Sequence, residues 1–236
     1  MPLRLKQTLR ALLPKEDEPV HFLHIGKCAG TQIGHAIGKL NERRAKMVVK
    51  KNEHDTYLRD IPASARYFFS IRDPIARFRS GFYSRQRKGQ PRYYYEWTSG
   101  EAQAFADFAH ANDLAEALFE NGELGSQAFR AIRSIRHTAQ NQVDWFGMSG
   151  DFLERRPPLW IVRQEHFEAD MLRLSKRMGE KLEVLTKASS QDPNASHSND
   201  YSGVPDFTSK AIENLRRWYA QDLVFYDQCE SWIERQ

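Results

Sequence analysis

The sequence predicts an α/β fold of three layers, with helices on both faces of a central, mostly parallel sheet. Short apolar runs of strand length occur at residues 20–25, 46–50, 66–71 and 159–163. Segments with apolar residues at helical spacing lie between or after these runs, and such alternation is typical of parallel sheets. A loop that contains glycines joins the first strand to the first helix, which gives a P-loop-like order of strand, loop and helix.

Each helix follows from its local pattern. Ile33, Ile37 and Leu40 fall at helical spacing within residues 31–43. Asp73 and Pro74 are a good N-cap and first residue for a second helix. Further helices are expected at residues 101–120, 124–137, 167–178 and 208–228, a short strand at 182–185, and a long polar loop at 189–205.

Composition excludes several classes of protein. Hydrophobic residues make up 40% of the 236 residues and charged residues 28%, which fits one globular domain rather than a disordered chain. Cys28 and Cys229 are too few for a disulfide framework, so a reducing compartment is expected. No apolar run approaches the roughly 18–20 residues that span a bilayer. We therefore expect a cytoplasmic protein with no integral membrane segment.

Two features leave alternatives open. The net charge is +4 and the pI about 9.0, which fits either a solvated surface or a site for polyanions or a multiply charged nucleotide. Residues 1–14 are basic, contain several leucines and lack a signal-peptide core. They fit a short amphipathic helix that packs on the protein, or a peripheral contact with a membrane surface.

The loop after the first strand, residues 26–31, has the composition of an anion-binding site. In a tight turn that enters a helix, successive backbone N–H groups point into one concavity, and the helix start adds partial positive charge. Lys27 supplies a full charge and Thr31 a hydroxyl, while the backbone is accessible at small residues, namely Gly26, Ala29 and Gly30. The Walker A pattern GxxxxGK[ST] is absent. The alternative is an ordinary turn with a surface lysine.

A second candidate site follows the strand at residues 66–71. Arg72 stands at the end of this strand, and its guanidinium can donate two hydrogen bonds to one phosphate. The helix that begins at Pro74 carries Arg77 and Ser80 on one face near its start. The alternative is that Arg72 pairs with a carboxylate and that Ser80 packs in the interior.

Together the two stretches resemble the sulfotransferase superfamily that depends on 3′-phosphoadenosine 5′-phosphosulfate (PAPS), closest to its membrane-type carbohydrate branch, as a bacterial-like soluble member. In that family xxPK[TS]xGTx binds the 5′-phosphosulfate and RDPxxRxxSxY binds the 3′-phosphate. The first pattern is matched by Lys27, Gly30 and Thr31, and the second by Arg72, Asp73, Pro74, Arg77, Ser80 and Tyr83. Gly26 replaces the usual proline, and Cys28 replaces a hydroxyl residue, which removes one donor.

The resemblance implies one sulfotransferase domain over residues 1–236, with a nucleotide-binding core at about 20–90 and 158–228 and a helical acceptor-side insertion at about 87–151. It implies transfer of a sulfuryl group from PAPS to a hydroxyl or amine, without metal and with PAP as the product. A saccharide or glycolipid is the expected acceptor. The implied cofactor-binding residues are Gly26, Lys27, Cys28, Ala29, Gly30, Thr31, Gln32, Arg72, Arg77, Ser80 and Ser198.

The resemblance also implies catalytic roles. Lys27 would stabilise the oxygen that leaves with the nucleotide. The acceptor must lose a proton to a general base, and relatives place a histidine or glutamate after the second strand. His54 is favoured here and Glu53 is the second candidate, while a surface histidine is the alternative for His54. Ser198 lies in a late loop that relatives use to cover the nucleotide, or that is simply solvated.

Two other functions remain as alternatives. A P-loop-type phosphotransferase or kinase would need a Walker lysine beside Ser or Thr and a magnesium-binding carboxylate, and neither is evident. A non-enzymatic nucleic-acid-binding module would use the basic segment 85–92 and its aromatic neighbours, Tyr93, Tyr94 and Tyr95, for base stacking. The sulfotransferase interpretation involves no nucleic acid, and the oligomeric state stays open.

Overall fold

The computed structural model describes residues 18–43, 47–147, 151–183 and 201–236. Contacts divide the chain into two compact units. The first unit comprises Met1–Ile71, Gln142–Leu185 and Asp227–Gln236, and the second comprises Arg72–Asn141 and Thr186–Tyr226. The expected N-terminal helix and Ser198 lie outside the described residues.

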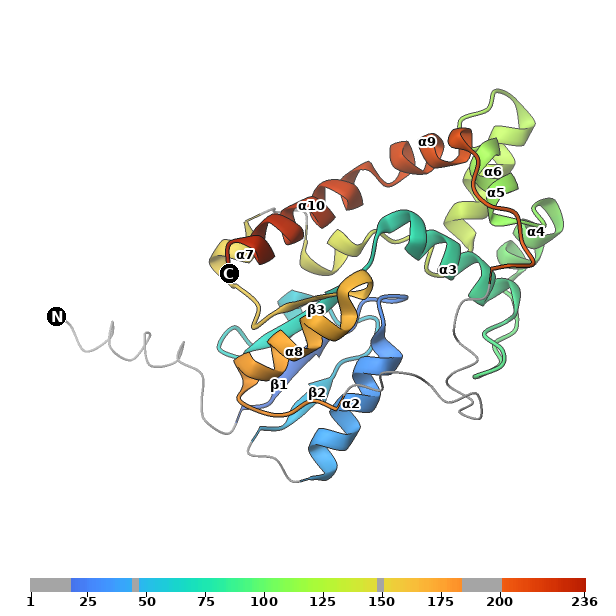
Figure 1. The fold of residues 1–236 in the computed structure, drawn as a ribbon. Coiled ribbons are helices and arrows are strands. Elements are labelled where there is room, and N and C mark those ends of the chain that lie inside the picture. The colour runs from blue at the N-terminus through green and yellow to red at the C-terminus, as the bar shows by residue number, and fades with distance from the viewer. Residues whose placement is uncertain (1–17, 44–46, 148–150, 184–200) are drawn as a thin grey trace. The chain divides into compact units, whose positions relative to one another are not determined.

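The first unit is built on a parallel sheet of four strands in the order β2-β1-β3-β4 (Figure 1). The strands are β1 (Val20–Leu23), β2 (Val49–Lys51), β3 (Tyr67–Ile71) and β4 (Ile161–Arg163). All four lie within the apolar runs that predicted them or overlap those runs. Pairing aligns Leu23 with Phe69 and Ile71 with Arg163, so the carboxyl ends of the strands meet at one edge of the sheet.

Helical segments cover both faces of this sheet. The helices α2 (Gly30–Glu42) and α8 (Phe167–Met178) pack beside β2 and β4 (Figure 1). The chain passes from β1 to β2 and from β3 to β4 in opposite directions across the sheet, so right-handed crossovers place the segment just before β4 on the other face. There Phe69 contacts Phe146 and Phe152, from η2 (Gln142–Phe146) and α7 (Phe152–Arg155). The predicted three-layer α/β fold is confirmed.

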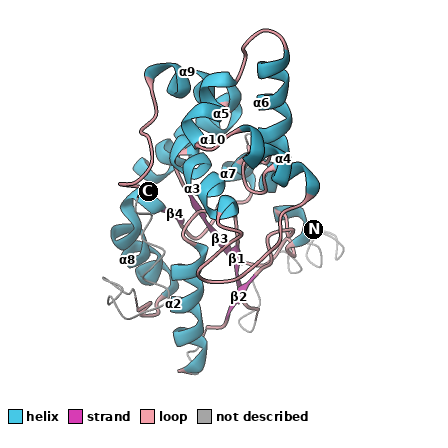
Figure 2. Cartoon of the chain, turned by 90° about the vertical axis from the view of Figure 1, so that its right-hand side faces the viewer, coloured by secondary structure: helices cyan, strands magenta, loops and turns pink. Residues whose placement is uncertain are grey.

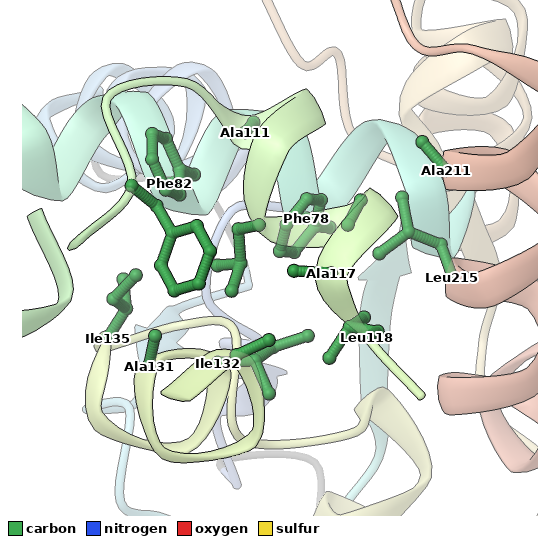
Figure 3. Close-up of a cluster of buried hydrophobic side chains, with 14 of the residues drawn as sticks. Phe78, Phe82, Ala111, Ala117, Leu118, Ala131, Ile132, Ile135, Ala211 and Leu215 are labelled. Carbon is green, nitrogen blue, oxygen red and sulfur yellow. The ribbon is translucent and has the colours of Figure 1, made fainter. Parts of the chain in front are cut away.

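The second unit is helical. It contains α3 (Pro74–Gln86), α4 (Ser99–Asp107), α5 (Ala111–Ala117), α6 (Glu123–Ser134) and α9 (Ser209–Trp218). Phe78 and Phe82 of α3 are buried in one cluster with Leu118, Ile132 and Leu215 (Figure 3). This cluster fixes α3, which carries the second candidate motif.

Two predicted helices are each broken in the structure. The segment 101–120 forms α4 and α5, because Phe108 and His110 are extended and the carboxylate of Asp113 caps the His110 N–H. The segment 208–228 forms α9 and then α10 (Ala220–Glu234), with the break at Tyr219. Figure 2 labels these helices in a second view.

The extra strand expected at residues 182–185 is wrong in its described part, because Leu182 and Glu183 are not in a strand. Arg43 donates to the Lys181 carbonyl at 2.6 Å and to the Glu183 carboxylate at 2.9 Å, so a side chain rather than a strand satisfies this backbone. The remaining elements are the short 3-10 helices η1 (Leu58–Asp60) and η3 (Gln164–His166). Within the described ranges, no helix has the length and apolarity that a membrane crossing requires.

Candidate active site

The loop between β1 and α2 has an unusual backbone. Lys27 and Ala29 have φ angles of +69° and +59°, in the left-handed region that residues with a Cβ seldom adopt, whereas Cys28 between them is outside it. Alternation of this kind is typical of the loops in which successive N–H groups point toward one anion, which are called nests. Ala29 is also the N-cap of α2, so the nest lies at the positive end of a helix.

The side chain of His24 packs against Gly30, the first residue of α2. A Cβ built on Gly30 would lie 1.8 Å from Nε2 of His24, so only glycine fits at this position. The His24 ring is itself held between Phe22, at 5.3 Å, and His54, at 3.9 Å between ring centroids. His24 is therefore a buried packing residue, and the loops that follow β1 and β2 meet at its ring.

The side chain of Cys28 points into the interior. Its thiol is fully buried and donates to Oε1 of Gln142 at 3.2 Å. The Ser70 hydroxyl on β3 donates to the Cys28 carbonyl. These two contacts attach the loop to β3 and η2. Because the thiol is occupied by Gln142, only the backbone N–H of Cys28 is a candidate donor to an anion. The loop pattern predicted neither Ser70 nor Gln142 as a partner.

His54, the favoured general base, is half-buried in the segment after β2. Its Nδ1 lies 3.1 Å from the carbonyl oxygen of His24. A carbonyl only accepts, so Nδ1 carries the hydrogen, and the neutral ring then has its lone pair on Nε2. The indole N–H of Trp145 donates to the His54 carbonyl at 3.0 Å and holds the backbone. Trp145 is a supporting residue that the sequence pattern did not reveal.

The other predicted residues of the first unit are less enclosed. Lys27, Ala29 and Thr31 are partly exposed, as an anion site requires, and Gly26 is buried. Gln32 is exposed on α2, and Glu53, the second candidate base, is also exposed. In the described ranges, no group of three or more His, Cys, Asp or Glu side chains is placed to hold a metal ion.

The second unit contains the other predicted motif. Ile71, at the carboxyl end of β3, leads directly into Arg72, which is 9% exposed. The Asp73 carboxylate caps α3 by accepting from the Ala76 N–H at 2.8 Å, and Pro74 occupies the first helical turn, as predicted. Ser80, about one and two-thirds turns after Pro74, is buried.

Arg77 lies deeper than the motif suggested. It is 1% exposed, donates to the Gln140 carbonyl at 2.7 Å and lies 4.0 Å from the carboxylate of Asp222. Asp222 is itself fully buried, so the two charges offset each other in the interior. These contacts hold α3 in place, and direct contact of Arg77 with the cofactor stays a prediction.

Comparison with known proteins agrees with these motifs. A model of the sulfotransferase family matches residues 10–227, which is most of the chain and includes both motifs. No curated protein and no solved structure matches the chain significantly. Because the family match covers far more than half of its length, this chain belongs to the sulfotransferase family, whose members are transferases of sulfuryl groups.

Proposed function

We propose that this sulfotransferase takes the sulfuryl group from PAPS and transfers it to a hydroxyl or amine of a saccharide or glycolipid. The observation that carries the proposal is the pair of left-handed residues, Lys27 and Ala29, which form an N–H nest at the start of α2. A nest beside a lysine suits a phosphosulfate, which presents several anionic oxygens to one surface. Bound PAPS would supply the sulfuryl group, with PAP as the leaving group.

Different groups of the loop would bind the 5′-phosphosulfate of PAPS. The backbone N–H groups of residues 26–30 would donate to phosphosulfate oxygens, and the Thr31 hydroxyl would add a donor. The Cys28 side chain is bonded to Gln142, so the proposal keeps only its backbone. Lys27 would stabilise the negative charge that develops on the bridging oxygen, which is an electrostatic contribution of the kind that dominates transfer of charged groups.

Arg72 and Ser80 would bind the 3′-phosphate. Arg72 can donate two parallel hydrogen bonds to phosphate oxygens, and the Ser80 hydroxyl one more. Arg77 would support them by its contacts with Gln140 and Asp222. Binding energy at this remote phosphate would orient the sulfuryl group for reaction.

His54 would accept the proton of the acceptor at Nε2. The hydrogen bond of Nδ1 to the His24 carbonyl selects the tautomer that can do this. Glu53 remains the second candidate, although its side chain is exposed and is therefore less firmly positioned.

The donor assignment is tested by thermal unfolding with nucleotides. PAP should raise the melting temperature in the presence of EDTA, because a ligand that binds the native state stabilises it. ATP with magnesium should have little effect. Stabilisation by ATP and magnesium, and none by PAP, would contradict the proposal and favour a phosphotransferase.

A further inference from the structure

We infer that Tyr201 is a third ligand of the anion that Arg72 and Ser80 bind, and that Arg79 positions it. The inference rests on the proposed function, since that anion would be the 3′-phosphate. All four residues belong to the second unit.

The hydroxyl of Tyr201 is screened from solvent and lies near the side chain of Ser80. Its oxygen is buried and, among the described residues, makes no hydrogen bond of good geometry. A buried hydroxyl without a partner costs free energy, so such groups usually belong to a site that a ligand or water completes. Because the Tyr201 and Ser80 hydroxyls are neighbours, both can donate to one anion.

Cationic groups surround this phenol. Burial raises the pKa of Tyr201, whereas the charge of Arg72, the hydrogen-bonding hydroxyl of Ser80 and the charges of Arg79 and Arg87 lower it, and the net direction is upward. The phenol is therefore protonated at neutral pH and able to donate. Three arginines near one donor hydroxyl make the local potential positive, which favours a ligand with more than one negative charge.

Arg79 holds Tyr201 in this position. Its guanidinium stacks on the Tyr201 ring at 4.6 Å and on the Phe207 ring at 5.3 Å. It also donates to the Pro205 carbonyl at 3.2 Å and to the carboxylate of Asp206 at 3.0 Å. Arg79 is adjacent to Ser80 on α3. Its contacts therefore hold the segment that contains Tyr201 against the helix that carries Ser80.

The test compares two nucleotides that differ only by the 3′-phosphate, PAP and adenosine 5′-monophosphate. Tyr201→Phe removes only the hydroxyl and keeps the ring contacts with Arg79 and Tyr83. We expect it to weaken PAP binding about tenfold or more, as for the loss of a hydrogen bond to a charged group. Affinity for adenosine 5′-monophosphate should not change. Tyr95→Phe, at an exposed tyrosine, is the matched control and should bind PAP as the wild type does.

Arg79 is tested by a double-mutant cycle. Arg79→Met should weaken PAP binding in the wild type and should do so less in the Tyr201→Phe background, since the two residues act through one contact. If Tyr201→Phe binds PAP normally while Arg72→Ala does not, the inference is overturned and the proposed function stands. If the wild type does not bind PAP, both are overturned.

Discussion

The imidazole of His24 occupies the space that a side chain at Gly30 would need, with 1.8 Å between Nε2 and a built Cβ. Because the His24 ring is confined by Phe22 and His54, it cannot move without disturbing both. Gly30→Ala should therefore destabilise the protein by about 1–3 kcal/mol, as for overpacking of a core. Urea unfolding measures this change, and PAP affinity should fall as well.

The same helix provides the control for this substitution. A Cβ on Gly38 would have no neighbour within 4 Å, so Gly38→Ala should be neutral or stabilise the protein by up to about 1 kcal/mol. Equal stability of Gly30→Ala and the wild type would show that the His24 contact does not constrain the loop.

Ala29 stores backbone strain in the nest. At a φ angle of +59°, its Cβ should cost roughly 1 kcal/mol relative to glycine. Ala29→Gly should therefore raise the free energy of unfolding by about that amount, with PAP binding retained because the N–H groups remain. Thermal and urea unfolding measure this, and a clear loss of stability would argue against a left-handed residue 29.

His54 and Glu53 can be separated by kinetics. His54→Ala should lower kcat about 10²- to 10⁴-fold, the usual contribution of a general base, with little change in PAP affinity. Glu53→Gln should leave kcat near the wild-type value, because this side chain is exposed. The reverse pattern, with a large loss only for Glu53→Gln, would assign the base to Glu53.

Stability should depend on pH through His21. Burial lowers the pKa of His21 despite its hydrogen bond to Asn52, and Lys50 and Arg156 lower it further. The unfolded chain therefore binds a proton more readily than the folded chain. The stability from this group is complete above about pH 6.5 and is lost as the pH falls through the lowered pKa.

A variant isolates this contribution. In urea unfolding between pH 7.5 and 5, His21→Gln should lose less stability on acidification than the wild type does. Parallel curves for the two proteins would show that His21 does not titrate differently on folding.

Much of the fold was predictable because β1 and β3 are short apolar runs that the parallel sheet buries along their whole length. The break between α4 and α5 was not, since Phe108 and His110 lie in a segment without glycine or proline. There Asp113 caps His110 and burial of Phe108 stabilises the extended backbone, so tertiary packing overrides helix propensity.

The candidate site was predictable in its local parts only. Lys27 lies in one short pattern, Arg72 and the Asp73 cap lie in another, and the resemblance to the family depends on both. Gln142 contacts Cys28 from 114 residues away in sequence and Trp145 contacts His54 from 91 residues away, so no local pattern can reveal them. The unsatisfied hydroxyl of Tyr201 likewise exists only once the chain has folded.

The most direct test of sulfuryl transfer is an assay with ³⁵S-labelled PAPS and a panel of saccharides and glycolipids. The wild type should label at least one acceptor class, and Lys27→Ala should reduce the rate about 10²- to 10³-fold, as for loss of a group that stabilises developing charge. Equal labelling by Lys27→Ala and the wild type would contradict the assignment of this loop as the centre of catalysis.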